Sequence, residues 1–500
     1  MADTKREIER KYTSDDSGLP DLRSVAGVAS VLDQGVADLD ATYYDTADER
    51  LAASSITLRR RTGGSDAGWH LKLPVADGER DEIREPLSDH VPSTLGALVR
   101  SRVRDAELTP VMRLRSTRDV RHLVDARGNL LAEVSVDVVR AERLSAGGGR
   151  AEWTEIEVEL ADGGDPAFLD EVEKQLRKAG VRPAGFPSKL ARALSETGGK
   201  RQPRGDDRAE PVTAGDHVLA YVRAQRDAMV ELDPAVRRDL EDSVHRMRVA
   251  TRRMRSAFRA YRTVLDRTVT DPVRAELKWL AGELGESRDH EVLAERISGA
   301  VGELPPDLVV GPVRDRMRAW AQAKRGQARR RIIDVLNGQR YLALLTSLDA
   351  LLADPPLRAA AAGKPSKVFP KALDKANDVV AGLVEKALDT PPGRDRDVAL
   401  HEARKKAKRA RYAAEVAAPA LGKPVSKPMK SMKDLQKLLG EHQDSVMSRA
   451  ALKELAGQAH EAGENSFTYG LLHAREEQRA AGTEEALPQA WAVARRKASG

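Results

Sequence analysis

The sequence predicts an α+β multidomain protein, with an N-terminal antiparallel β-barrel tunnel flanked by helices and a C-terminal all-α helical bundle. Three observations support this prediction. From residue 7 to about 160, apolar and polar side chains alternate with period two between turn signals, as in strands. From residue 213 onward, Ala, Leu, Arg and Glu recur at helical spacing. Two segments of the helical region repeat, which predicts two pseudo-symmetric halves.

The chain of 500 residues is too long for one ordinary core, so two or three domains are expected. A stretch rich in Gly, Pro and charged residues separates the region with strand periodicity from the region with helical periodicity. We predict a β domain at residues 1–197, a linker at 198–212 and a helical domain at 213–495. The halves of the helical domain are expected near residues 213–353 and 365–495.

The composition excludes several classes of site. The sequence contains no cysteine, so disulfides, thiolate zinc sites and cysteine nucleophiles are excluded. This fits a reducing compartment, and we expect a cytoplasmic protein. The first residues lack the apolar stretch of a signal peptide, and no later segment approaches membrane-spanning length, so no membrane partner is expected.

Charged residues alternate along the predicted strands. Glu7, Glu9 and Lys11 project from one face of the first strand. Further strands carry the alternating charged residues Arg59, Arg61, Lys72, Arg113, Arg115, Glu155, Glu157 and Glu159. A sandwich would leave these charges in water, whereas a barrel with helices outside could turn them inward, and alternation alone does not separate the two. Because acidic strands at both ends of the domain bracket basic strands in the middle, we favour the barrel.

This mixture of charges indicates a metal and phosphate site. Hard divalent cations prefer carboxylate oxygens, and phosphoryl oxygens prefer Arg and Lys. We therefore expect Mg²⁺ or Mn²⁺ to bridge the glutamates and a phosphorylated substrate. The sequence contains no P-loop pattern, which disfavours ordinary nucleotide-dependent motor chemistry.

Five ordered segments resemble the CYTH family of triphosphate tunnel metalloenzymes: Glu7-x-Glu9-x-Lys11, LRRRTGG, AGWHLKLP, EIEVEL and PSKLARAL. The resemblance spans residues 5 to about 195 and implies an eight-stranded tunnel that hydrolyses a triphosphate with a divalent metal. It implies metal ligands at Glu7, Glu9, Glu157 and Glu159. It implies phosphate binding by Lys11, Arg59, Arg61, Lys72, Arg113, Arg115 and Lys189, with Lys11, Glu9 and Arg59 as the catalytic residues. Glu82, Asp137 and Glu155 are neighbours whose roles are less defined.

Two helical segments carry matching basic stripes. At 100° per residue, His245, Arg248, Arg252 and Arg255 share one helix face, and His401, Arg404, Lys408 and Arg411 repeat the same offsets. Residues 245–262 contain seven arginines and no acid, so the usual helix ion pairs are absent there. A solvated face is the ordinary reading of such a run. Its repetition, followed each time by Leu-Gly-Glu-x-x-Asp at residues 284–289 and 439–444, instead favours a bound polyanion.

These two segments resemble the CHAD domain, over residues 213 to about 495. The resemblance implies binding of inorganic polyphosphate by His245, Arg248, Arg252, Arg255, Arg259, His401, Arg404, Lys405, Lys408 and Arg411. Glu402 stands where the first copy has Arg246, so the second stripe is expected to be less basic. His290 and His442 either add to this site or have surface or core roles.

The leading hypothesis is metal-dependent hydrolysis of inorganic triphosphate, or of a related triphosphate, in the tunnel, with longer polyphosphate held by the helices. Thiamine triphosphate hydrolysis and cyclisation of ATP use the same kind of tunnel and stay open. A non-catalytic protein that binds and organises polyphosphate is the competing class. Nucleic-acid binding is disfavoured because aromatic stacking residues are few. The sequence does not predict the oligomeric state.

Overall fold

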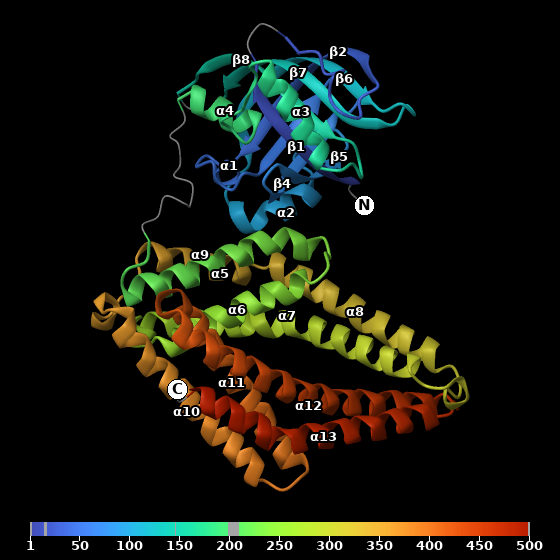
Figure 1. Cartoon of the computed structure of the whole chain (residues 1–500), viewed down its shortest axis with the longest axis vertical. Coiled ribbons are helices and arrows are strands. Elements are labelled where there is room, and N and C mark those ends of the chain that lie inside the picture. The colour runs from blue at the N-terminus through green and yellow to red at the C-terminus, as the bar shows by residue number, and fades with distance from the viewer. Residues whose placement is uncertain (1–2, 15–17, 146, 199–209, 499–500) are drawn as a thin grey trace. The chain divides into compact units, whose positions relative to one another are not determined.

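The computed structural model describes residues 3–14, 18–145, 147–198 and 210–498, with no side chains described for residues 3, 286–289, 426–428, 497 and 498. The chain divides into two compact units, Met1–Arg208 and Ala209–Gly500 (Figure 1). The two units are described separately. Most of the predicted linker, residues 199–209, lies outside the described residues.

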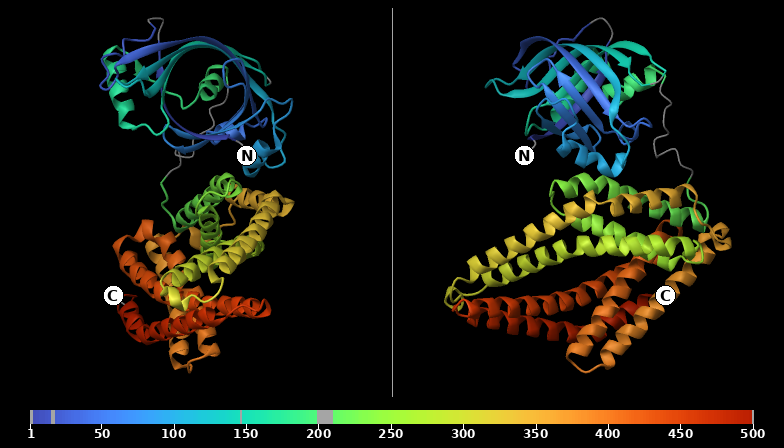
Figure 2. Two further views of the ribbon diagram at one scale, coloured as in Figure 1. Left: turned by 90° about the vertical axis from the view of Figure 1, so that its right-hand side faces the viewer. Right: turned by 180° about the vertical axis from the view of Figure 1, so that it is seen from behind.

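The first unit is a closed antiparallel β-barrel, which confirms the predicted barrel (Figure 2). The neighbouring strands follow the order β5-β4-β3-β2-β6-β7-β8-β1, and β5 also pairs with β1, which closes the ring. The strands are β1 (Asp3–Thr13), β2 (Ser30–Asp45), β3 (Thr57–Thr62), β4 (Gly68–Ala76), β5 (Glu79–Glu85), β6 (Thr109–Val124), β7 (Leu130–Arg143) and β8 (Arg150–Leu160). A two-residue strand, β9 (Arg182–Pro183), pairs with the end of β1.

Closure brings the two ends of the domain together. Residues 3–8 of β1 pair with β5, whereas residues 9–13 pair with β8. In this register Glu9 lies opposite Glu159, and Lys11 lies opposite Glu157. The acidic strands that are most distant in sequence are therefore neighbours in the barrel.

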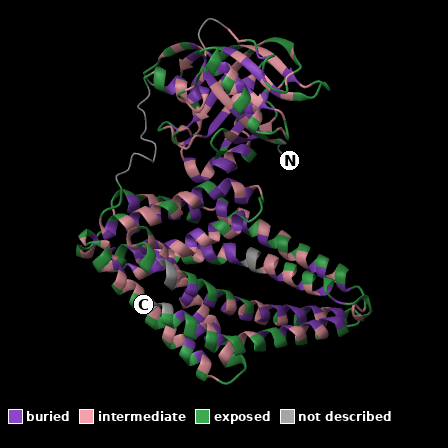
Figure 3. Cartoon of the chain, in the orientation of Figure 1, coloured by how far each residue is buried: buried purple, intermediate pink, exposed green. Residues whose placement is uncertain are grey.

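Helices bury the outer faces of the strands. The helix α3 (Ala167–Lys178) buries Leu169, Val172 and Leu176 in a core with the outward-facing side chains of β1, β7 and β8. The helix α2 (Ser93–Val103) packs in the same way on the outer face of β3, β4 and β5, and the short helix α1 (Arg50–Ala53) borders it. Period-two alternation is thus set by apolar packing outside the barrel, with charge inside. Buried residues recur along the strands of the barrel (Figure 3).

One end of the barrel interior is apolar. The helix α4 (Lys189–Glu196) begins at the N-cap Ser188, whose hydroxyl accepts a hydrogen bond from Ala191 N at 3.1 Å. Its apolar residues pack with the inward-facing side chains of β6, β7 and β8, namely Met112, Leu114, Val139, Ala141 and Trp153. α4 therefore fills this end and leaves the polar residues at the other end around a cavity.

The second unit consists of helices, as predicted, within the described residues. They are α5 (Ala214–Arg237), α6 (Ser243–Ala260), α7 (Arg267–Gly302), α8 (Val313–Asn337), α9 (Gln339–Ala353), α10 (Pro365–Asp389), α11 (Arg394–Leu421), α12 (Lys423–Glu461) and α13 (Phe467–Ala498). Two single turns of 3₁₀-helix, Pro306–Leu308 and Ala359–Ala362, lie in the connections. No helix among the described residues is both long and apolar enough to cross a membrane.

The packing order repeats along the helical unit. Sequence neighbours pack together from α5 to α8 and again from α10 to α13, while α9 packs on α5, α7 and α8. The two helices with the basic stripes, α6 and α11, contact each other. Tyr261 donates a hydrogen bond to Ala413 O at 2.7 Å, and Arg253 lies 2.9 Å from Glu415. These contacts fix the two stripes against each other.

Candidate active site

A cavity of about 520 Å³ occupies the polar part of the barrel interior. Every strand of the barrel contributes lining residues. The cavity collects charged side chains of both signs: Lys5, Glu7, Glu9, Lys11, Arg59, Arg61, Asp66, Lys72, Arg80, Glu82, Arg84, Arg118, Glu133, Glu157, Glu159, Asp162 and Lys189. Charges confined in this way interact strongly, because little water screens them.

An acidic wall, formed by Glu7 and Glu9 of β1 with Glu157 and Glu159 of β8, lines one side of the cavity. Lys11 lies between the two strands, with its ammonium 3.1 Å from Glu9 and in closer contact with Glu157. Burial opposes the ionisation of Glu9 and Glu157, but Lys11 and the other neighbouring cations outweigh it and hold the pKa of both carboxyls below the ordinary value. Both residues are therefore carboxylates at neutral pH.

Glu7 differs from the rest of the acidic wall. Burial raises the pKa of Glu7 to about 7. Lys72, at 2.5 Å, opposes this shift, whereas the negative charges of Glu82 and Glu9 add to it. A bound cation would favour the ionised form of Glu7 and lower its pKa. Carboxylates on two adjacent strands, one of them short of positive charge, form a donor set that fits Mg²⁺ or Mn²⁺.

A second acidic group has ligand atoms close enough to hold a metal ion: Asp137, Glu155 and Glu157. The ammonium of Lys189, the first residue of α4, lies 2.6 to 2.9 Å from all three carboxylates. Burial opposes protonation of Lys189, yet the three acids raise its pKa above the ordinary value. Lys189 therefore occupies this group as a permanent cation, and the part of the acidic wall around Glu7 fits a metal better.

A basic wall, formed by Arg59 and Arg61 of β3 and Lys72 of β4, also lines the cavity. Arg59 lies 3.6 Å from Glu82 and donates a hydrogen bond to the Tyr43 hydroxyl at 3.3 Å. Burial and the neighbouring positive charges of Arg59 and Arg118 together lower the pKa of Arg61 to about 9. Asp66 is the acidic residue in contact with Arg61. A phosphate would add negative charge beside this crowded guanidinium, which favours its protonated form.

Glu82 contacts several cations that line the cavity. Its carboxylate lies 3.7 Å from Lys72 and 2.5 Å from Arg84, and the ring of His70 lies 2.9 Å away. The other ring nitrogen of His70 lies 2.9 Å from Asp66 O in the loop after β3. Glu82 thus positions cations around the cavity, whereas the sequence alone left its role undefined.

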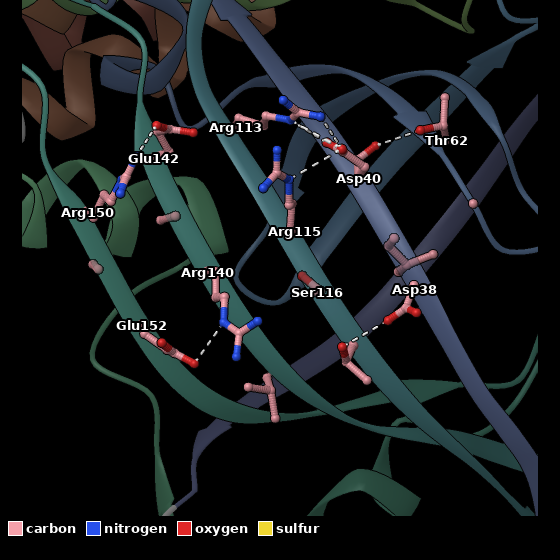
Figure 4. Close-up of a pocket in the computed structure, with 16 residues that line it drawn as sticks. Asp38, Asp40, Thr62, Arg113, Arg115, Ser116, Arg140, Glu142, Arg150 and Glu152 are labelled. Atoms are coloured by element: carbon pink, nitrogen blue, oxygen red, sulfur yellow. Dashed lines mark hydrogen bonds and ion pairs between the residues drawn. The ribbon is translucent and has the colours of Figure 1, made fainter.

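Two predicted tunnel residues do not face the cavity. Arg113 and Arg115 lie on the outer face of β6, where Asp40 lies 2.5 Å from Arg113 and 3.7 Å from Arg115 (Figure 4). There they line a separate outer hollow of about 780 Å³ with paired acids and arginines of β2, β7 and β8. The expectation that they point inward is wrong, because the inward-facing residues at this end of β6 are Met112 and Leu114, which pack on α4.

Arg118 is the arginine that β6 contributes to the cavity, and it was missed. Its guanidinium lies 2.7 Å from Asp137 and 2.7 Å from Glu157. Arg118 shares the face of Leu114 and Ser116 by period-two alternation, so the signal was present in the sequence. Arg80, Arg84 and Lys5 also face the cavity and were not predicted.

The basic stripes of the helical unit meet at the contact of α6 and α11. Burial, together with the positive charges of Arg404, Arg252 and Arg248, lowers the pKa of Lys408 to about 7. Arg255 shows the same effect, since burial together with Arg409, Arg252 and Arg274 lowers its pKa to about 10. Cations from both halves therefore crowd one another, as expected of a site built for a polyanion.

The remaining predicted residues of the stripes have different surroundings. Arg411 lies 3.1 Å from Glu415 and donates a hydrogen bond to Gln436 at 3.2 Å, so it is held within the fold. Lys405 lies 2.8 Å from Glu402, and Arg259 is exposed. Burial lowers the pKa of His401, which favours the neutral ring, and His245 is half-buried on α6.

The two histidines whose roles were left open have packing partners elsewhere in the helices. The ring of His290 meets Trp320 edge-on at 6.3 Å between centroids. His442 is buried, with Asp397 and Glu484 both 3.2 Å from its ring nitrogen. Of the Leu-Gly-Glu-x-x-Asp phrases, the side chains of residues 286–289 lie outside the described residues, whereas Asp444 lies 3.8 Å from Arg404.

Comparison with known proteins agrees with this division. The CYTH domain family model matches residues 5–190, and the CHAD domain family model matches residues 220–453. An uncharacterized protein of Mycobacterium tuberculosis, present in two strains, is 39% identical over 490 residues, which cover 94% of this chain and 92% of the relative.

Two solved structures resemble part of the chain. PptA from Streptomyces chartreusis is 22% identical, with a TM-score of 0.48, over 56% of this chain and 99% of its own. The CHAD domain from the plant Ricinus communis is 23% identical, with a TM-score of 0.45, over 58% of this chain and 96% of its own.

Proposed function

This chain belongs to the family of proteins in which a CYTH domain precedes a CHAD domain, and we propose that it hydrolyses inorganic triphosphate, or a related triphosphate, in its barrel. We further propose that its helical domain binds polyphosphate. The observation that carries the proposal is the closed barrel, whose strands all turn side chains toward one cavity of about 520 Å³ with an acidic and a basic wall. Such a cavity fits a compact polyanion together with a cation.

In the proposed mechanism, Glu7, Glu9, Glu157 and Glu159 hold Mg²⁺ or Mn²⁺, which supplies charge neutralisation at the phosphoryl oxygens. Arg59, Arg61 and Lys72 bind and orient those oxygens, and Arg118 of β6 and Lys189 of α4 add positive charge to the cavity. Glu9 orders the attacking water, whose oxygen forms a bond to the phosphorus in line as the bond from that phosphorus to the leaving phosphate oxygen breaks, without a covalent intermediate. Lys11, between Glu9 and Glu157, stabilises the charge that develops on the leaving phosphate.

The direct test measures phosphate released from tripolyphosphate by the full chain with Mn²⁺ or Mg²⁺. We expect turnover that EDTA abolishes and that Glu9→Gln lowers by about 100-fold, the order expected for losing one group that stabilises transition-state charge. Thiamine triphosphate and ATP assayed alongside would identify the substrate, with cyclic AMP as the product of cyclisation. Turnover that survives both EDTA and Glu9→Gln would contradict the proposal. Tight binding without phosphate release would favour the competing role, a protein that organises polyphosphate.

Polyphosphate binding should also take up a proton. Lys408 has a pKa of about 7 because of burial and because Arg404, Arg252 and Arg248 face it, with Asp444 as the acidic neighbour. A bound polyanion favours the protonated amine and raises this pKa, so affinity should fall as the pH rises above about 7. Calorimetry in two buffers of different ionisation enthalpy would measure the proton uptake. Lys408→Arg, which stays charged, should remove the pH dependence, and an unchanged proton uptake in this variant would contradict the assignment to Lys408.

A further inference from the structure

Two glycines lie at matching places in the two halves of the helical unit. Gly285 in α7 and Gly440 in α12 each follow a buried leucine, Leu284 and Leu439. Glycine in a helix interior is less favourable than alanine, so its presence at the same place in both copies needs a local reason. The reason is found in the stripe arginines Arg248 and Arg404, which are also at matching places.

Each glycine lies beneath a stripe arginine. A methyl group built on Gly285 would lie 3.0 Å from Arg248 Nη2 and 3.2 Å from Cζ and Nε of the same side chain. A methyl group on Gly440 would lie 3.7 Å from Nε and Nη2 of Arg404. The two guanidinium groups thus rest on the helix surface where a side chain is missing. Gly282 in α7 and Gly457 in α12, by contrast, have nothing within 4 Å of that position.

The two arginines converge on the same group. Both Arg248 and Arg404 are close enough to Lys408 to lower its pKa, although they come from different halves. Arg404 Nε is buried and donates no hydrogen bond within the described part of the chain. Asp444 lies 3.8 Å from Nη2 of the same guanidinium. A guanidinium held against a helix loses less conformational freedom when it grips a phosphate than one that moves freely.

We propose that Gly285 and Gly440 are positioning residues for polyphosphate, each of which seats one stripe arginine so that Arg248 and Arg404 reach one stretch of the phosphate chain together. This inference rests on the proposed polyphosphate binding. It assigns a function to the Leu-Gly pair of the repeated phrase, and it predicts that side-chain volume at these positions weakens binding without removing any charge.

The test compares alanine substitutions by calorimetry with polyphosphate of defined length. Gly285→Ala must displace the guanidinium by a few tenths of an ångström, and we expect about tenfold weaker binding, the effect of one lost charge-assisted contact. A methyl group on Gly440 would lie at an ordinary contact distance from Arg404, so Gly440→Ala should change affinity by less than about twofold. Gly440→Leu, whose larger side chain would take the place of the guanidinium, should weaken binding about tenfold, and no loss in this variant would overturn the assignment to Gly440. Gly282→Ala and Gly457→Ala are the matched controls in the same two helices, and both should bind like the unsubstituted chain.

A double substitution separates positioning from a general effect on the fold. In the Arg248→Ala background, Gly285→Ala should cause no further loss, because the group on which it acts is gone. Thermal unfolding and barrel turnover of each variant report whether the chain folds. Equal affinity of Gly285→Ala and the unsubstituted chain would overturn the inference, as would a loss that persists in the Arg248→Ala background. Absence of binding by the unsubstituted chain would instead overturn the proposed function, and the inference with it.

Discussion

Replacing Arg59 by alanine is expected to lower kcat/KM for tripolyphosphate by about 100- to 1,000-fold, the range seen when one preorganised donor to a developing charge is removed. Arg59 is suited to this role because Glu82 and Tyr43 hold its guanidinium at 3.6 and 3.3 Å on the wall of the cavity. Burial opposes its charge, but Tyr43 and Glu82 raise the pKa of Arg59, so the group stays protonated at any working pH. Its contribution should therefore be independent of pH.

Arg113→Ala is the matched control for Arg59→Ala. Both positions were expected to bind phosphate, but Arg113 lies on the outer face of β6 and pairs with Asp40. Steady-state assays at saturating metal should therefore show a change of less than about twofold for Arg113→Ala. A loss in Arg113→Ala comparable to that in Arg59→Ala would show that the substrate binds outside the barrel, and the tunnel proposal would then be abandoned.

The barrel and its acidic wall followed from the sequence because each strand alternates. Ile8 and Tyr12 of β1 and the apolar residues of β8 pack outward beneath α3, so the opposite face, with Glu7, Glu9 and Glu157, had to line the interior. Closure could be favoured only on the composition of the charged faces, since alternation is the same in a sandwich. The pairing of β1 with both β5 and β8 settled it.

The error on β6 has a physical origin. The rule that apolar means outward and charged means inward holds only where the interior contains water. At the end filled by α4, the inward-facing Leu114 is apolar and the outward-facing Arg113 is charged, so the rule reverses along one strand. Arg118, four residues after Leu114, returns to the polar part of the interior. The sequence of β6 alone does not show where a distant helix ends.

The sequence predicted that the helical stripes repeat, but it did not predict which of their residues are covered by the rest of the fold. Matching offsets placed Arg248 and Arg404 on equivalent faces, and the contact of α6 with α11 brings these faces together. Arg411, on the same predicted stripe as Arg404, lies against Glu415 and Gln436. The stripe pattern alone does not predict these partners. Helical periodicity identifies a shared face but not the partner that covers it.

The largest effect on stability is expected from Lys189→Met, which keeps most of the side-chain volume and removes the charge. Lys189 compensates Asp137, Glu155 and Glu157 at 2.6 to 2.9 Å. Without it, Arg118 would remain beside Asp137, and Lys11 and Arg118 would remain beside Glu157. Removing one partner leaves buried charge uncompensated, which destabilises proteins by about 3–5 kcal/mol. Hydrogen exchange of the β7 and β8 amides would measure this loss in the barrel alone. Lys5→Met is the control, because its partner Glu159 is partly exposed and such pairs contribute only about 0–1 kcal/mol.

The pH dependence of this effect has a definite sign. In the unsubstituted chain, burial opposes ionisation of Asp137 and Glu157, but the neighbouring cations hold the pKa of both below the ordinary value, so their contribution to stability is lost as the pH falls through those low values. Without Lys189, less positive charge opposes burial, so the pKa of both carboxyls rises relative to the unsubstituted chain and they are protonated at a higher pH in the variant. The stability difference should therefore be largest near neutral pH and should shrink as the pH falls through the pKa values that these two carboxyls have in the variant. A difference that stays constant with pH would mean that Lys189 stabilises the barrel through its packing on α4 and not through its charge.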